Sequence, residues 1–108
     1  MNGYIIDYFI EFTLGRSLAK AIEAHKAGRI QEAGELYTAI IQAEPTHPDA
    51  NHNLGLLSVG EGEIEEAITF FKVALAANFS EGQFWLSYMD CLMELGRSVE
   101  AQPLIYQA

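Results

Sequence analysis

Residues 51–75 read NHNLGLLSVGEGEIEEAITFFKVAL, and this stretch carries two apolar patterns with helical spacing on either side of a glycine-rich turn. Leu54 and Leu57 mark the buried face of a first helix, and Ala67 and Phe71 mark the buried face of a second. Glycine ends a helix readily because the left-handed backbone conformation costs least without a Cβ atom. The stretch therefore predicts a helical hairpin.

The features of this hairpin recur along the chain with a fixed period of about 34 residues. The recurring positions hold glycine, glutamate and alanine in the same order: Gly28, Gly62 and Gly96; Glu32, Glu66 and Glu100; Ala33, Ala67 and Ala101. Tyr37 and Phe71 add an aromatic residue in the same register. Self-similarity at a fixed period of this length is typical of stacked helical repeats, and each recurring glycine is expected to make a left-handed turn.

The expected helix starts follow the same period. Thr46 and Ser80 are separated by one such period. Each is predicted to cap the first helix of its hairpin, because its hydroxyl oxygen can accept a hydrogen bond from a free backbone N–H group of the first turn. Ser80 and Gln83 also have the spacing of a capping box. Phe12 takes the equivalent place near the N-terminus and cannot cap a helix. The first helix is therefore expected to extend upstream through residues 4–14.

The middle hairpin resembles a tetratricopeptide repeat, whose unit is a helix–turn–helix of about 34 residues. The resemblance rests on residues in the order that the family uses, which here are Asn51, Leu54, Gly55, Gly62, Ala67, Phe71 and Ala74, with Pro45 closing the preceding unit. It implies an all-α, right-handed solenoid of about three antiparallel helix pairs. We expect a single domain over residues 1–108, which is divided into an apolar extension (1–13), a first repeat (14–47), a second repeat (48–81) and a shortened third repeat (82–108).

Composition limits the classes of partner. The chain has 108 residues with six Lys and Arg against fifteen Asp and Glu, a formal net charge of −9. Such a charge repels phosphate backbones and anionic lipid, so neither nucleic acid nor a membrane is expected as a partner. The most apolar stretch, residues 4–14, is too short to span a bilayer and is interrupted by Asp7 and Glu11. We therefore expect a cytoplasmic protein.

The residues that could carry chemistry do not form a recognisable site in the sequence. His47, Asp49 and His52 lack a further strong ligand that a zinc site would need. Cys91 is the only cysteine, and no histidine or basic residue stands near it to activate the thiol. The sequence therefore predicts no metal site, no cofactor and no catalytic residue.

The resemblance also implies a binding surface, because the first helices of such repeats line a concave face. Counting along them gives a predicted peptide-binding wall of Leu18, Ile22, His25, Lys26, Asp49, His52, Leu56, Val59, Gln83, Leu86, Asp90 and Met93. A carboxylate clamp is not expected, since the matching places hold Leu18, Ile22, Leu86 and Asp90, and only Asn53 is compatible with one. We expect a partner protein or peptide with apolar anchors and a basic residue that meets Asp90 and Glu94.

A non-catalytic interaction scaffold is the preferred function, and two alternatives stay open. The first is self-association through apolar residues near the two ends, which are Tyr4, Ile5, Tyr8, Phe9, Phe12, Leu104 and Ile105. The second alternative places the module ahead of a larger enzyme. Residues 79–97, FSEGQFWLSYMDCLMELGR, resemble the repeat modules found in front of bacterial glycosyl- and other group-transferase domains.

Overall fold

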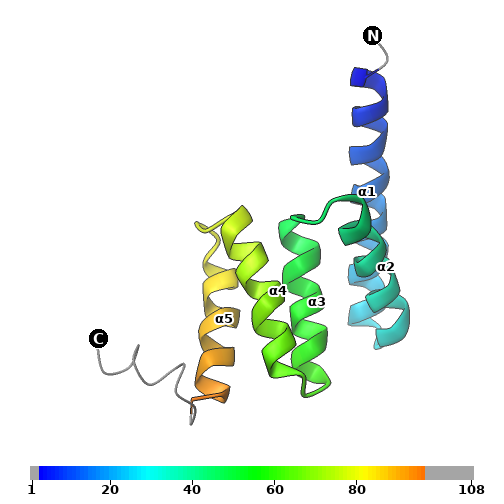
Figure 1. Cartoon of the computed structure of the whole chain (residues 1–108). Helices are drawn as coiled ribbons and strands as arrows, with labels where there is room; N and C mark the ends of the chain where they lie inside the picture. Colours follow the sequence, from blue (N-terminus) through cyan, green and yellow to red (C-terminus); the bar gives the residue numbers. More distant parts are fainter. Residues whose placement is uncertain (1–2, 97–108) are drawn as a thin grey trace. The chain divides into compact units, whose positions relative to one another are not determined.

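A computed structural model describes residues 3–96 and shows five α-helices and no strand in that range (Figure 1). The helices are α1 (Gly3–Lys26), α2 (Ile30–Ala43), α3 (Pro48–Gly60), α4 (Ile64–Ala77) and α5 (Gly82–Glu94). They form two compact units: α1 and α2 make the first, and α3 to α5 make the second. The predicted all-α repeat fold is confirmed.

In the first unit, α1 and α2 form a helical hairpin around small and aromatic side chains. Ala21 and Ala24 of α1 and Ala33, Tyr37 and Ile40 of α2 are almost completely buried. At 1.5 Å per residue, the 24 residues of α1 span about 36 Å, whereas the 14 residues of α2 span about 21 Å. The N-terminal part of α1 therefore extends past α2 (Figure 1), and the predicted upstream extension of the first helix is confirmed.

In the second unit, α4 packs against both α3 and α5, and α3 and α5 also touch. The core contains Ala67, Ile68 and Phe71 of α4 together with Cys91 and Leu92 of α5. Further along α4, a smaller cluster forms from Ala74, Leu75 and Phe84. The apolar positions that the repeat period singled out on α4 thus face the interior of the unit.

The turn glycines follow the prediction in two of three cases. Gly28 and Gly62 have φ values of 82° and 80°, so both adopt the left-handed conformation that ends the preceding helix. Gly96 does not have a positive φ. Its N–H donates to the Met93 carbonyl oxygen at 2.8 Å, and a Cβ atom at Gly96 would collide with that carbonyl group. The expected left-handed turn at Gly96 is therefore wrong, although the position still requires glycine.

The predicted cap of α3 is wrong by one residue. The cap is His47, whose Nδ1 accepts a hydrogen bond from the Ala50 N–H at 3.1 Å, and Thr46 lies one residue outside. Pro48 explains the difference, because it occupies the first helical position, where its missing N–H and fixed φ are best tolerated. The residue before that proline must then take the place of the cap.

The predicted cap of α5 is displaced in the same way. Glu81 is the cap, and its Oε1 accepts from the Gln83 N–H at 3.3 Å. Ser80 instead donates its hydroxyl to Oδ1 of Asn78 at 2.9 Å, so the expected capping box of Ser80 and Gln83 does not form. The two true caps, His47 and Glu81, are again separated by one repeat period.

Two glycine-to-alanine changes should have opposite effects on stability. A Cβ atom at Gly55 would lie 2.7 Å from Cδ1 of Phe71, whose ring is fully buried and would have to shift. Gly55→Ala should therefore lower the free energy of unfolding by about 1–3 kcal/mol through overpacking, partly offset by about 1 kcal/mol of helix propensity. Gly15 lies inside α1 with nothing within 4 Å of the same atom.

Gly15→Ala should consequently raise the free energy of unfolding by up to about 1 kcal/mol. Urea unfolding followed by circular dichroism measures both variants. Equal shifts of the two midpoints in the same direction would contradict the close packing of Gly55 against Phe71.

Candidate functional site

A groove in the second unit is the main candidate site. It lies between α3, α4 and α5 and has a volume of about 160 Å³. Its lining combines apolar side chains, one hydroxyl group and two carboxylates: Leu56, Val59, Ile64, Phe71, Ser87, Asp90, Cys91 and Glu94. The structure thus brings Leu56, Val59 and Asp90 of the predicted wall together at one groove.

The apolar part of the groove is formed by α3 and α4. Leu56 and Val59 lie three residues apart on α3, on one helix face, and each is 37% exposed. Phe71 of α4 is fully buried and Ile64 is half-buried. The groove therefore offers exposed aliphatic side chains above a rigid aromatic base.

The acidic part of the groove belongs to α5. Asp90 and Glu94 are exposed and lie one helical turn apart, so their side chains are neighbours on the helix surface. Burial raises the pKa of the nearby Cys91 thiol, and the negative charges of Asp90 and Glu94 raise it further. The thiol therefore stays protonated at neutral pH and serves as a packed side chain rather than a nucleophile.

His52 does not lie on the exposed wall where the sequence placed it. Its side chain is 5% exposed, and its Nε2 atom is 2.7 Å from the Ser87 hydroxyl oxygen. Its ring centroid lies 4.7 Å from that of Phe84 and 5.4 Å from that of Phe71. His52 was predicted as a residue of the peptide-binding wall, but its side chain is buried and joins α3 to α5.

The contact of His52 with Ser87 has the composition of a base and a nucleophile, and no local sequence pattern indicates it because the two residues lie 35 positions apart. Ser87 lies in the interior of α5, where backbone N–H groups donate to carbonyl groups one turn earlier. Acyl transfer needs donors aimed at a developing oxyanion, and a helix interior does not supply them. The pair is better explained as a hydrogen bond that fixes the spacing of the two helices.

The buried position of His52 makes stability depend on pH. Burial lowers the pKa of His52 below its ordinary value, and this effect exceeds the opposing influence of Asn53, Asp49 and Glu81. Between the folded and unfolded pKa values, the unfolded chain binds a proton that the folded chain does not. The free energy of unfolding should therefore fall as the pH drops below about 6.5, by at most about 1.4 kcal/mol per pH unit for one proton.

Urea unfolding at about pH 7.5 and about pH 5.5 tests this expectation in the wild type and in His52→Gln. The wild type should lose more stability between the two pH values than the variant, because only the wild type must protonate a buried imidazole on unfolding. An equal loss of stability in both proteins would exclude His52 as the origin of the pH dependence.

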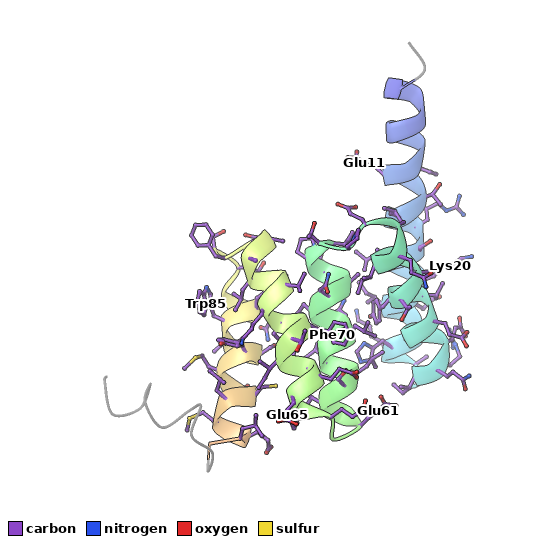
Figure 2. All side chains as sticks on the ribbon, viewed as in Figure 1. Glu11, Lys20, Glu61, Glu65, Phe70 and Trp85 are labelled. Carbon is purple, nitrogen blue, oxygen red and sulfur yellow. The ribbon has the colours of Figure 1, made fainter. Side chains whose placement is uncertain are left out.

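The remaining wall residues of the second unit are exposed. Leu86 and Met93 of α5 are 59% and 55% exposed, and Asp49 and Gln83 are exposed at the start of their helices. Trp85 of the same helix is 45% exposed and donates its indole N–H to the Phe79 carbonyl oxygen. Figure 2 shows Trp85 on the side of α5 away from α4.

The wall residues of the first unit lie on α1. Leu18, Ile22 and His25 are half-buried, and Lys26 is exposed. His25 is held by a contact of 3.2 Å between its Nδ1 atom and the Tyr37 hydroxyl group. These residues belong to the first unit, whereas the groove belongs to the second.

The residues expected to drive self-association are described only in part. Phe12 is 56% exposed on α1. Tyr4, Ile5, Tyr8 and Phe9 belong to α1, but their side chains lie outside the described part of the structure, as do residues Leu104 and Ile105 altogether.

The part of the chain that the structure describes contains neither a metal-binding cluster nor a membrane-spanning helix. No group of three or more His, Cys, Asp or Glu side chains in the described range is placed to hold a metal ion. Among the described helices, none has the length and apolar character needed to cross a bilayer.

Solved structures with a similar fold support the architecture. The first tetratricopeptide repeat domain of Spaghetti (RPAP3), bound to the HSP90 peptide SRMEEVD, has a TM-score of 0.73 and 21% sequence identity, covering 83% of this chain and 71% of that one. The Yersinia enterocolitica type III secretion translocator chaperone SycD has a TM-score of 0.76 and 18% identity, covering 92% and 74%. A D159K mutant of MamA has a TM-score of 0.66 and 25% identity, covering 92% and 63%.

The sequence comparisons give the family. No curated protein matches the chain closely enough to be compared with it. The family model described as tetratricopeptide repeat matches residues 24–85, which is more than half of the chain and includes α2, α3 and α4 completely. The chain therefore belongs to the tetratricopeptide repeat family.

Proposed function

We propose that this protein is a non-catalytic interaction module that binds a segment of a partner protein in the groove between α3, α4 and α5. The observation that carries the proposal is the combination, in one groove, of exposed aliphatic side chains with two neighbouring carboxylates. Binding sites for peptides commonly use such an apolar anchor point with charged groups at the rim.

The apolar part of the groove fits an aliphatic or aromatic anchor. Leu56 and Val59 are partly exposed, and an incoming side chain would remove their remaining surface from water. Burial of apolar surface contributes about 25 cal/mol per Å², so a single well-placed anchor supplies a large share of the binding energy. Phe71, which is already fixed by burial, loses little freedom when the anchor binds.

The acidic rim selects the charge of the partner. Asp90 and Glu94 favour a lysine or arginine within about one turn of the anchor, and the overall charge of −9 attracts basic segments over a longer range. The HSP90 peptide seen with the similar RPAP3 domain contains three acidic residues. An acidic groove disfavours such a peptide, so a different class of ligand is proposed here.

A peptide library tests the proposal. Peptides that bind the intact protein should be enriched in an apolar residue accompanied by lysine or arginine, and Leu56→Asp should weaken them at least tenfold because it places a charge in the apolar part of the groove. Phe79→Asp is the matched control, since Phe79 is 74% exposed and lies outside the groove lining. Equal affinity of the wild type and Leu56→Asp would overturn the proposal.

A further inference from the structure

Two rows of exposed side chains on different units have complementary chemistry. On α1, Phe12, Arg16 and Lys20 follow one another at intervals of one helical turn. On α5, the residues Leu86, Asp90 and Glu94 have the same spacing. Each row begins with an apolar residue and continues with two like charges, and the charges of the two rows are opposite.

The α1 row is accessible. Phe12 is 56% exposed, and the guanidinium carbon of Arg16 lies 5.8 Å from the centre of its ring. Together with Thr13 and Ser17, the row borders a shallow depression of about 420 Å³ on α1. Figure 2 shows Lys20 projecting from this helix. Because α1 extends past α2, the beginning of the row is not covered within its own unit.

The α5 row borders the groove of the proposed function. Asp90 and Glu94 belong to the groove lining, and Leu86, which is 59% exposed, lies one turn before Asp90 on the same helix face. A helix placed along this row would therefore cover the acidic rim of the groove.

The attraction between the two rows is local, because both units are negatively charged overall. Residues 1–45 hold four Lys and Arg against six Asp and Glu, and residues 46–108 hold two Lys and Arg against nine Asp and Glu. Net charge therefore does not favour contact between copies, whereas opposite charges at matched spacing attract each other where the two rows meet.

We propose that α1 of one copy docks alongside α5 of a second copy, with Phe12 against Leu86, Arg16 beside Asp90 and Lys20 beside Glu94. The helices then run parallel, and a shallow crossing angle of about 20° lets all three pairs meet. The contact is heterologous, because it joins different surfaces of the two copies. This inference rests on the proposed function, since it names the protein's own α1 as an occupant of that binding surface.

Charge reversal tests the pairing. Arg16→Glu with Lys20→Glu makes both rows acidic, and Asp90→Lys with Glu94→Lys makes both rows basic. In sedimentation velocity at high micromolar concentration, the wild type should self-associate. Each double variant alone should self-associate with a dissociation constant at least tenfold higher. An equimolar mixture of the two double variants should associate, and so should one chain that carries all four changes.

Control variants separate pairing from net charge. Glu44→Lys with Glu61→Lys alters the net charge by the same amount as the α5 reversal, but at exposed positions that follow α2 and α3. Lys26→Glu with Lys72→Glu is the matching control for α1, because both lysines are exposed and lie outside the row. Both controls should associate like the wild type, and circular dichroism should show unchanged helix content in every variant.

A monomeric wild type, or a mixture of the double variants that fails to associate, would overturn the inference. If library peptides still bind and Leu56→Asp still weakens them, the proposed function survives that failure. If Leu56→Asp leaves peptide affinity unchanged while the mixture associates, the groove is not the peptide site and the pairing of the two rows stands alone.

Discussion

Phe71→Ala is expected to lower the free energy of unfolding by about 3–5 kcal/mol, because it removes a large aromatic side chain from a fully buried position. The ring contacts His52 at a centroid distance of 5.4 Å and closes against Gly55, where no side chain could fill the space left behind. It also belongs to the groove lining, so its loss removes the base on which the proposed anchor rests.

Phe70→Ala is the matched control, since Phe70 is the same residue type on the same helix but is only half-buried. The comparison needs urea unfolding of both variants, followed by circular dichroism, with amide exchange to locate the loss in α3 to α5. If Phe70→Ala lowers the free energy of unfolding as much as Phe71→Ala does, the packing described for the second unit is contradicted.

Tyr37→Ala should have an effect of similar size, about 3–5 kcal/mol, on the first unit. Tyr37 is the repeat equivalent of Phe71 and is likewise fully buried. Its hydroxyl group, however, contacts Nδ1 of His25 at 3.2 Å, an interaction that a phenylalanine cannot make. Tyr37→Phe should therefore cost only about 0.5–1.5 kcal/mol, the net value of one hydrogen bond.

Amide exchange of α1 and α2 measures both changes at Tyr37. Protection should be largely lost in Tyr37→Ala and only modestly reduced in Tyr37→Phe. If the two variants lose equal protection, the hydrogen bond with His25 rather than ring burial holds this unit together.

The fold could be predicted from the sequence because its packing residues repeat at fixed spacing. Ala33 and Ala67 are both fully buried, and Tyr37 and Phe71 fill equivalent places in their units. Small and aromatic residues at these positions are required wherever two helices pack closely, so one period predicts the contacts of each hairpin.

The helix starts were harder to predict from the sequence, because capping depends on backbone geometry at single residues. Thr46 and Ser80 are better caps by general preference than histidine or glutamate. The proline at position 48 nevertheless fixes the start of α3 and gives the cap to His47. Greater weight on that proline would have predicted the correct residue.

The groove was only partly predictable for a different reason. Counting along first helices found Leu56, Val59 and Asp90, but it left out Phe71 and Ser87, which enter the groove through the angles at which helices cross. The contact between His52 and Ser87 joins residues 35 positions apart, and no local pattern records it. Spacing along one helix shows which side chains share a face, whereas pairing between helices follows from three-dimensional packing.

The regular spacing of Gly28 and Gly62, and of His47 and Glu81, has a genetic consequence. Any window of one repeat length taken from this region contains one glycine that ends the first helix of a pair and one cap that begins such a helix. A tandem duplication of such a window would add one of each at the existing spacing without altering those already present. Lengthening by whole units is thus the mutational route that disturbs this architecture least.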